Sequence, residues 1–229
     1  MRKSALSILL AVLMAVSMLT IGALAYGEDG FDLVAEINEA NADTTGEPIT
    51  ITIPEGNYAP TANEQLRITR DNVTIVGAGM GKTIIDCGDY SCSGQGALLI
   101  SADNVTIKDL TIKSSATSGN VGAIKVTDVN TGTNLIKDVK IVNVDARCEN
   151  GHGINLHGVK DAVVTNCVVT GGKCGISLAN AVNVTVSGTS STGKWGSVGM
   201  MYKAGSEFYA NPVSLTVGAG NSFTYIYRE

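Results

Sequence analysis

Two short apolar patterns recur through the middle of the chain, and they constrain its fold more than any other feature. In the first, an Asn or Asp precedes three residues that are apolar or β-branched in every copy except for Lys140, and it recurs at steps of 32, 34, 23 and 22 residues. In the second, two apolar residues at alternate positions follow a glycine, with steps of 26, 30, 22 and 22 residues. The first series begins at Asn72, Asn104, Asp138, Asp161 and Asn183, and the second comprises Leu98/Ile100, Ile124/Val126, Ile154/Leu156, Ile176/Leu178 and Val198/Met200.

A period of two predicts β-strands, and each repeat therefore holds two short strands that cannot bury a face alone. Stacking successive repeats gives a continuous core, which is the principle of a solenoid. Repeats of this length with β-branched residues predict an all-β fold, a single-stranded right-handed parallel β-helix that rises by about 4.8 Å per coil. The Asn or Asp marks a turn, because its side chain bonds nearby backbone and tolerates left-handed dihedral angles. Leucine-rich repeats have similar lengths, but their signature is missing.

Residues 1–25 are predicted to be a signal peptide rather than part of the fold. Arg2 and Lys3 form a basic start, an apolar run follows, and Ala23-Leu24-Ala25 is a small-x-small cleavage site. The alternative is a membrane anchor helix, for which the run is marginal in length. Residues 26–229 then form one β-helix domain, and no second long apolar run predicts a transmembrane segment after signal cleavage.

Removal of this leader moves the formal charge from −5 to −7. An acidic chain without a basic cluster does not favour nucleic acid as a partner. The expected localisation is secreted or at the cell surface.

The two ends of the domain are expected to be capped. Residues 31–41 place apolar side chains on one helical face and predict an N-terminal capping helix. Aromatic residues gather from about 194 to 229 and predict a C-terminal cap. Such caps protect the exposed edge strands of a solenoid.

Five cysteines follow the leader, and an exported protein can oxidise them. Cys87 and Cys92 flank one short loop, and Cys148 and Cys174 lie just outside neighbouring strands, so the predicted disulfides are Cys87–Cys92 and Cys148–Cys174. Cys167 takes the inward position that Val144 occupies in the preceding repeat, and it is predicted to be a free core thiol.

Three stretches carry a resemblance to a known family: Ile51 to Tyr58, Asn72 to Asp86 and Asn104 to Ile112. They resemble the opening coils of the pectate-lyase-like superfamily, and pectin methylesterases contain similar sequence motifs. Gly151 to Asp161 looks more like the non-catalytic, adhesin-like surface proteins that are built on the same scaffold. The resemblance spans about Ile49 to Met201 and implies a parallel β-helix, but its motifs specify the coil and not an activity.

The catalytic motifs of these families are incomplete in the chain. The couplet at Ile124 and Val126 lacks the glutamine of pectin methylesterases. Gly151-His152-Gly153 matches one polygalacturonase motif, yet no pair of adjacent aspartates and no Arg-Ile-Lys follows. No catalytic residue is therefore predicted.

The candidate ligand-binding residues are polar groups on successive loops. Paired carboxylates can hydrolyse glycosides, and an indole can stack on a sugar ring. The solvated surface of an ordinary loop is the favoured explanation of these charges, and packing in the C-terminal cap is the favoured explanation of the tryptophan. The candidates are Asp145, Glu149, His152, Lys173, Lys194 and Trp195.

No metal site is predicted. His152 and His157 flank one strand on opposite sides, which does not favour a shared metal. Asp86 and Asp89 could hold Ca²⁺, the cofactor that the resemblance to a pectate lyase implies, but they lack the spacing of a calcium loop. We therefore expect no cofactor.

Two functions fit these observations. The first is non-catalytic adhesion or glycan binding by an exported β-helix of the cell envelope or extracellular space, with a polysaccharide or cell-surface glycan as partner. The alternative is a minimal polysaccharide lyase or hydrolase that acts on acidic glycans such as pectin. The incomplete catalytic motifs favour the first.

Overall fold

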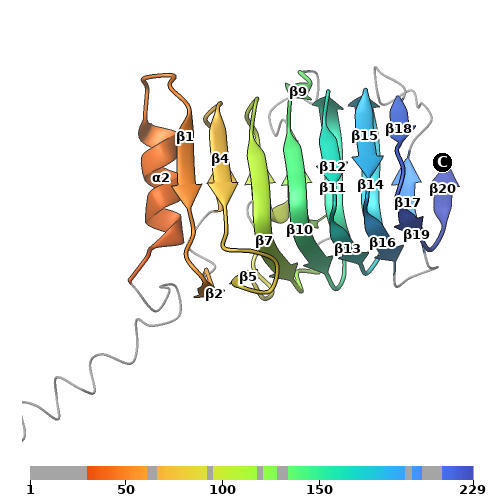
Figure 1. Ribbon diagram of the computed structural model, residues 1–229, viewed down its shortest axis with the longest axis horizontal. Coiled ribbons are helices and arrows are strands. Elements are labelled where there is room, and N and C mark those ends of the chain that lie inside the picture. Colours follow the sequence, from red (N-terminus) through yellow and green to blue (C-terminus); the bar gives the residue numbers. More distant parts are fainter. Residues whose placement is uncertain are drawn as a thin grey trace, which may run out of the picture.

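The computed structural model describes residues 30–60, 66–91, 95–117, 121–127, 134–193, 198–202 and 213–228. Within these residues the chain forms a β-solenoid of about six turns, here called coils, in which the paired strands are parallel. Figure 1 shows the coils stacked from helix α2 (Leu33–Ala42) at one end to β20 (Ile226–Arg228) at the other. The predicted parallel β-helix with an N-terminal helix is confirmed. The predicted signal peptide, Cys92, Lys194 and Trp195 lie outside the described residues.

The strands of the described residues form two sheets. The twelve-stranded sheet contains β1 (Ile49–Thr52), β2 (Gly56–Tyr58), β4 (Val73–Val76), β5 (Thr83–Asp86), β7 (Thr106–Ser114), β10 (Lys140–Cys148), β12 (Val163–Thr165), β13 (Val168–Gly171), β15 (Val184–Ser187), β16 (Ser190–Gly193), β18 (Leu215–Val217) and β19 (Ser222–Phe223). The eight-stranded sheet contains β3 (Arg67–Ile68), β6 (Gly96–Ile100), β8 (Gly122–Val126), β9 (Ile136–Lys137), β11 (His152–Lys160), β14 (Cys174–Val182), β17 (Val198–Tyr202) and β20.

A typical coil has three strand segments, not the two predicted from the sequence. The first two belong to the larger sheet and are separated by a left-handed residue, such as Asp109 (φ 57°) within β7 or Asn143 (φ 53°) within β10. In the following coils Asn166 (φ 53°) separates β12 from β13, and Gly188 (φ 57°) separates β15 from β16. This second corner interrupts the alternation of apolar residues, which is why the sequence pattern alone did not predict the middle segment.

The recurrent apolar couplets fill the interior, as predicted. Leu98, Ile124, Ile154 and Ile176 lie in register on neighbouring strands, and each is at most 2% exposed. Complete burial of one such side chain stabilises the fold by about 1.5 to 3 kcal/mol. The column is therefore held together by aliphatic contacts between adjacent coils.

The Asn and Asp residues that open each repeat form a ladder at one corner. All five have left-handed φ values, from 52° to 63°. Asn104 Nδ2 donates to Asn72 Oδ1 at 2.7 Å, and Asn183 Nδ2 donates to Asp161 Oδ1 at 2.6 Å. The side chains thus connect one coil to the next at the position where most other residues would be strained.

Helix α2 closes the N-terminal end of the column. Asp32 caps it by accepting hydrogen bonds from the N–H groups of Val34 and Ala35, and Leu33, Ile37 and Ala40 form its buried face. Near the end of the helix, Asn41 accepts from the N–H of Thr69 and donates to the carbonyl of Arg67, so it hydrogen-bonds at both ends of β3. This contact protects the edge strand of the smaller sheet.

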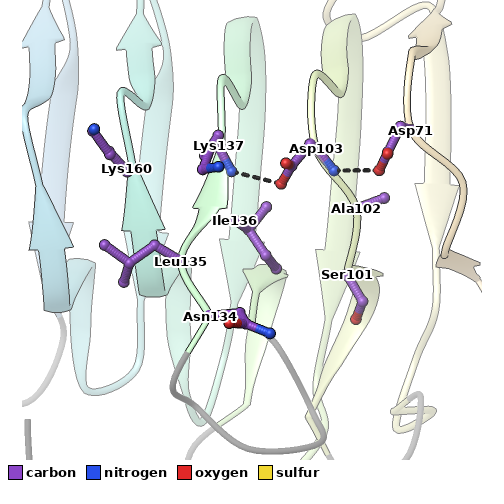
Figure 2. A pocket seen from close by; sticks show the side chains of 9 residues that line it. All are labelled: Asp71, Ser101, Ala102, Asp103, Asn134, Leu135, Ile136, Lys137 and Lys160. Atoms are coloured by element: carbon purple, nitrogen blue, oxygen red, sulfur yellow. Dashed lines mark hydrogen bonds between the residues drawn. The ribbon is translucent and has the colours of Figure 1, made fainter.

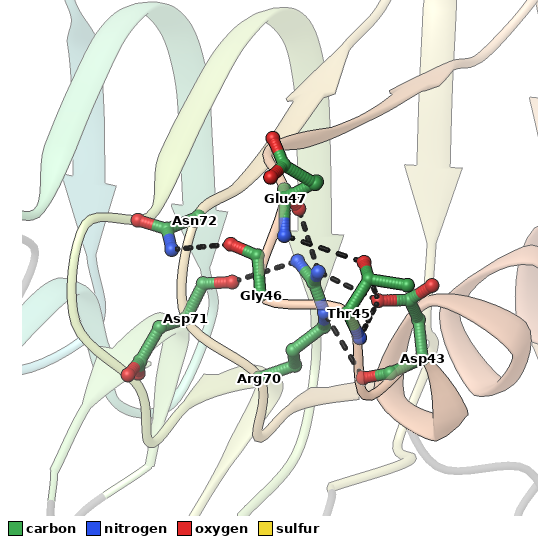
Figure 3. A network of polar contacts seen from close by, with 7 residues as sticks. All are labelled: Asp43, Thr45, Gly46, Glu47, Arg70, Asp71 and Asn72. Carbon is green, nitrogen blue, oxygen red and sulfur yellow. Dashed lines mark hydrogen bonds and ion pairs between the residues drawn. The ribbon is translucent and has the colours of Figure 1, made fainter.

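Arg70 joins the cap to the first complete coil, as Figure 3 shows. Its guanidinium is buried and donates to the Asp43 carboxylate at 2.7 Å and to the carbonyls of Asp43, Glu47 and Asp71. In the same network Asn72 donates to the carbonyl of Gly46. Arg70 therefore holds the segment between α2 and β1 in place through several hydrogen bonds.

The C-terminal segment that was predicted to form a cap contributes further strands to the stack. Strands β18, β19 and β20 pair with β15, β16 and β17, respectively. Within the described residues, no helix is sufficiently long and apolar to cross a membrane.

The cysteines require one correction. Cys148 and Cys174 are both buried free thiols, so the predicted Cys148–Cys174 disulfide is not formed in the structure. Cys148 pairs with Gly171 at the end of the larger sheet, whereas Cys174 begins β14 in the smaller sheet, where its Sγ lies 2.9 Å from His152 Nδ1. Cys167 is buried and free as predicted, and burial raises its pKa to about 11. Cys87 is a free thiol, and its predicted bond to Cys92 remains a prediction.

A lysine at an inward position should unfold the protein. Val105 is fully buried and directly follows the corner residue Asn104. We expect Val105→Lys to lower the free energy of unfolding by about 3 to 5 kcal/mol, because the ammonium group would be buried without a partner. Thr74→Lys is the matched control, since Thr74 lies on the outer side of β4 and should tolerate lysine. Urea unfolding of both variants measures the difference, and equal stabilities would contradict the inward register.

Candidate functional site

Two grooves follow corners of the column. The first, here called the Glu149 groove, has a volume of about 510 Å³ and lies at the C-terminal ends of strands β5, β7, β10 and β13. The second, here called the Lys160 groove, has a volume of about 600 Å³ and lies at the corner where the chain leaves the smaller sheet (Figure 2). Both volumes are in the range of small-ligand sites.

The Glu149 groove is built from a row of outward side chains on successive coils. Asp86, Lys113, Arg147 and Thr170 lie in register on β5, β7, β10 and β13. Lys113 Nζ is 4.0 Å from Asp86 Oδ2, and both side chains are substantially exposed. The row thus presents two adjacent cations, a carboxylate and a hydroxyl group at the spacing of the coils.

Asp145, on the same strand as Arg147, forms an ion pair with that member of the row. Arg147 donates to Asp145 Oδ1 at 2.8 Å through Nε and to Asp145 Oδ2 at 2.5 Å through Nη2. The pKa of Arg147 is raised, first because of these hydrogen bonds and second because of the negative charge of Asp145. Both oxygens of the Asp145 carboxylate thus accept a hydrogen bond from Arg147.

Tightly packed glycines form the end of the groove. Gly171 and Gly172 line it, and a Cβ at Gly172 would lie 1.9 Å from the backbone oxygen of Glu149. Glycine is therefore required for the close approach of adjacent coils at this corner. The backbone of these coils contributes to the groove where larger side chains would fill it.

His152 lies inside the protein and not in either groove. It is 4% exposed and contacts Cys174, with 2.9 Å between Nδ1 and Sγ. Burial, and then the nearby positive charges of Lys173 and Lys125, lowers the pKa of His152 to about 4. Burial raises the pKa of Cys174 to about 12. The two groups are therefore uncharged near neutral pH, and this His–Cys pair lacks the thiolate that a nucleophilic cysteine needs.

The structure does not bring all the predicted site residues together. Glu149 lines the groove, and Asp145 anchors Arg147 beside it. His152 is buried, whereas Lys173 is exposed on the loop before Cys174 and lies close enough to influence its charge state. Lys194 and Trp195 are outside the described residues. Lys113 and Arg147 were not predicted, although aligning the coils from Asp109 and Asn143 would place them in one outward row.

A second unpredicted feature is a buried polar row on the smaller sheet. The row consists of Lys125, Asn155 and Ser177, which lie in register on consecutive coils and are each at most 6% exposed, and the apolar Leu99 takes the same position on the coil before them. Lys125 donates to Gln95 Oε1, and burial lowers the pKa of Lys125 to about 8. Both faces of these strands are thus buried, whereas alternation alone predicts one exposed face. Among the described residues, no three His, Cys, Asp or Glu side chains gather at a potential metal site.

These observations define a parallel β-helix with polar grooves along its corners, and comparison with known proteins assigns its family. The family model for rhamnogalacturonase A/epimerase, pectate lyase-like proteins matches residues 21–214. The chain therefore belongs to this family. No curated protein sequence matches the chain.

Solved structures show the same fold at low sequence identity. A pectin methylesterase mutant in complex with a hexasaccharide has a TM-score of 0.53 and 16% identity, over 92% of this chain and 67% of the other. The ORF18 protein of Geobacillus virus E2 has a TM-score of 0.51 and 16% identity, over 83% of this chain and 35% of the other. The chain therefore spans about a third of that viral protein. A pectin methylesterase from Yersinia enterocolitica matches with 15% identity and a TM-score of 0.47, over 73% of this chain and 54% of the other.

The buried His152 should make stability depend on pH in a defined window. Its folded-state pKa of about 4 lies below the unfolded value of 6.5, so the folded state binds fewer protons. The contribution of His152 to the free energy of unfolding is fully present above pH 6.5. It is lost as the pH decreases toward 4, by about 3 kcal/mol in total.

Urea unfolding at about pH 7.5 and about pH 4.5 measures this loss. His152→Gln should remove most of the difference between the two pH values, whereas His157→Gln should retain it, because His157 is the other histidine of the chain and is partly exposed. An unchanged difference in His152→Gln would show that His152 does not carry the linkage.

Proposed function

We propose that the protein is a non-catalytic glycan-binding β-helix whose ligand lies along the Glu149 groove. The observation that carries the proposal is the outward row that includes Lys113, Arg147 and Thr170, in register on successive coils and beside the backbone of Gly171 and Gly172. A repeating row of charged and hydroxyl groups suits a polymer with repeating polar groups. Coils about 4.8 Å apart extend that row along the axis, as an extended sugar chain requires.

The charges of the row favour an acidic glycan. Lys113 and Arg147 are neighbouring cations, and the ion pair that Lys113 makes with Asp86 is long and exposed to solvent, hence weak. A uronate carboxylate can replace the contact between Lys113 and Asp86 at little cost. Family membership and the hexasaccharide complex of the structurally similar pectin methylesterase support a glycan ligand.

Binding without turnover is favoured by the state of the carboxylates. Glu149 lines the groove, but Asp145, the second carboxylate of the predicted pair, is held by Arg147 through both oxygens. His152 is buried against Cys174 and does not reach the groove. The alternative function, a polysaccharide lyase or hydrolase, is favoured by the description of the family.

The proposal also includes the location of the protein. The basic start, apolar run and small-x-small site of residues 1–25 support export, followed by action at the cell envelope or in the extracellular space. A polysaccharide or cell-surface glycan would be the partner encountered there. Trp195, which lies outside the described residues, remains predicted to stack on a sugar, and Trp195→Ala should weaken retention on an immobilised polysaccharide.

Two variants with opposite expected effects test the groove. Lys113→Gln should weaken binding of tetragalacturonate by roughly fivefold, because it removes an exposed cation. Glu149→Gln should strengthen binding by a similar factor, because it removes a carboxylate that repels the ligand. Isothermal titration calorimetry at low salt measures both affinities.

Lys82→Gln is the matched control, since Lys82 is an exposed cation outside both grooves. General loss of folding cannot produce a gain of affinity in one variant and a loss in the other. If Lys113→Gln and Glu149→Gln both bind as the control does, the ligand does not occupy the Glu149 groove.

A further inference from the structure

The Lys160 groove has an unusual order of charges along the column. Asp71, Asp103, Lys137 and Lys160 succeed one another on four consecutive coils, as Figure 2 shows, and all four line the groove. Two acids therefore occupy one end and two bases the other. Steps of about 4.8 Å between coils separate neighbouring members of this row.

The acidic end is held in place by backbone hydrogen bonds. Asp71 Oδ1 accepts from the N–H of Asp103 at 2.8 Å, and Asp103 Oδ1 accepts from the N–H of Lys137 at 2.9 Å. An ionised carboxylate offers about four acceptor positions, so each can also accept a hydrogen bond from a ligand hydroxyl. These carboxylates are fixed acceptors that face the groove.

The basic end carries two lysines at paired backbone positions. Lys137 and Lys160 are paired directly across β9 and β11, and both are exposed. Within the described residues neither forms an ion pair within 4.0 Å, although Asp138 and Asp161 follow them in the chain. Asp161 is instead engaged by the amide of Asn183 at 2.6 Å. Like charges directly opposite in a sheet destabilise it, and an anion between the two lysines would relieve the repulsion.

Three apolar side chains lie between the two ends. Ala102 and Ile136 are buried, and Leu135 is partly exposed beside them. Ser101 adds a hydroxyl group at the rim, where it also donates to the carbonyl of Thr127. Apolar side chains with a few polar groups beside them are the usual composition of a small-ligand site.

We propose that the Lys160 groove is a second glycan site that binds an anionic sugar unit adjoining neutral units. The anionic group, a carboxylate or a sulfate, lies between Lys137 and Lys160, and hydroxyl groups of the neighbouring neutral sugar donate to Asp103 and Asp71. A continuous polyuronate is disfavoured, because its next carboxylates would lie against the two aspartates. The groove therefore selects a glycan with spaced charges, unlike the ligand proposed for the Glu149 groove.

Titration with four tetrasaccharides tests this selectivity in the intact protein. The probes are an alternating glucuronate–N-acetylglucosamine tetrasaccharide, a keratan sulfate tetrasaccharide that is sulfated on its N-acetylglucosamine units alone, tetragalacturonate and neutral cellotetraose. Lys137→Gln and Lys160→Gln combined should lower the affinity for the alternating probe by roughly tenfold or more, and leave binding of tetragalacturonate unchanged. Tighter binding of the alternating or the sulfated probe by the unaltered protein identifies carboxylate or sulfate as the preferred anion.

Asp103→Asn provides the opposite test. It keeps the Oδ1 acceptor for the N–H of Lys137 but removes the charge, so tetragalacturonate should gain affinity by roughly fivefold through the Lys160 groove. Lys113→Gln is the control for the other groove and should not alter binding of the alternating probe. This separates failure of the second site from failure of the first.

Three results would overturn the second site. The first is that the unaltered protein fails to bind both the alternating and the sulfated probes at millimolar concentration. The second is that the double lysine variant binds them as Lys82→Gln does. The third is that cellotetraose binds as tightly as the anionic probes, which would show that the two lysines do not select the ligand.

Discussion

The left-handed corner residue is the constraint on which the rest of the structure depends. Asn72, Asn104, Asp138, Asp161 and Asn183 all have φ values between 52° and 63°. Such dihedrals cost most residues roughly 1 to 2 kcal/mol, whereas Asn and Asp offset that cost with local side-chain hydrogen bonds. Because the corner recurs at the same place in each coil, the strands that follow it start in register. The aliphatic interior and the outward rows are consequences of that register.

The same register places chemistry at the corners. Side chains at equivalent positions of successive coils form rows, so a single polar residue in one repeat becomes part of a surface that extends along the axis. The row through Lys113 and Arg147 lines the Glu149 groove, and the row from Asp71 to Lys160 lines the Lys160 groove. The two binding proposals therefore rest on the order of charges from coil to coil.

Local patterns in the sequence were sufficient to predict the corner ladder, the inward couplets and the capping helix. Each depends on residues that are close in sequence or repeat at a regular interval, as with Leu98 and Ile124. The middle strand of the coil was missed because Asp109 and Asn143, which have left-handed dihedral angles, turn the backbone just before that strand. This turn breaks the period of two. The role of Arg70 was missed for a different reason, since its partners Asp43 and Glu47 lie in a turn without a repeat.

The candidate site was predicted less well, for a physical reason. Sequence position placed Glu149 and Asp145 near each other, but not the orientation that gives both oxygens of Asp145 to Arg147. Proximity also suggested a Cys148–Cys174 disulfide, whereas the two residues belong to different sheets and Cys174 contacts His152. Pairing and burial depend on how coils stack, and a single repeat does not contain that information.

The central claim is that the protein retains glycans without cleaving them. The most direct measurement incubates the mature protein with polygalacturonate, with and without calcium, and follows unsaturated and reducing ends while a parallel assay records retention on the immobilised polymer. The account predicts retention with no increase in either kind of end. Release of products by the unaltered protein that is abolished in an Asp145→Ala/Glu149→Ala variant would contradict the account and establish an enzyme.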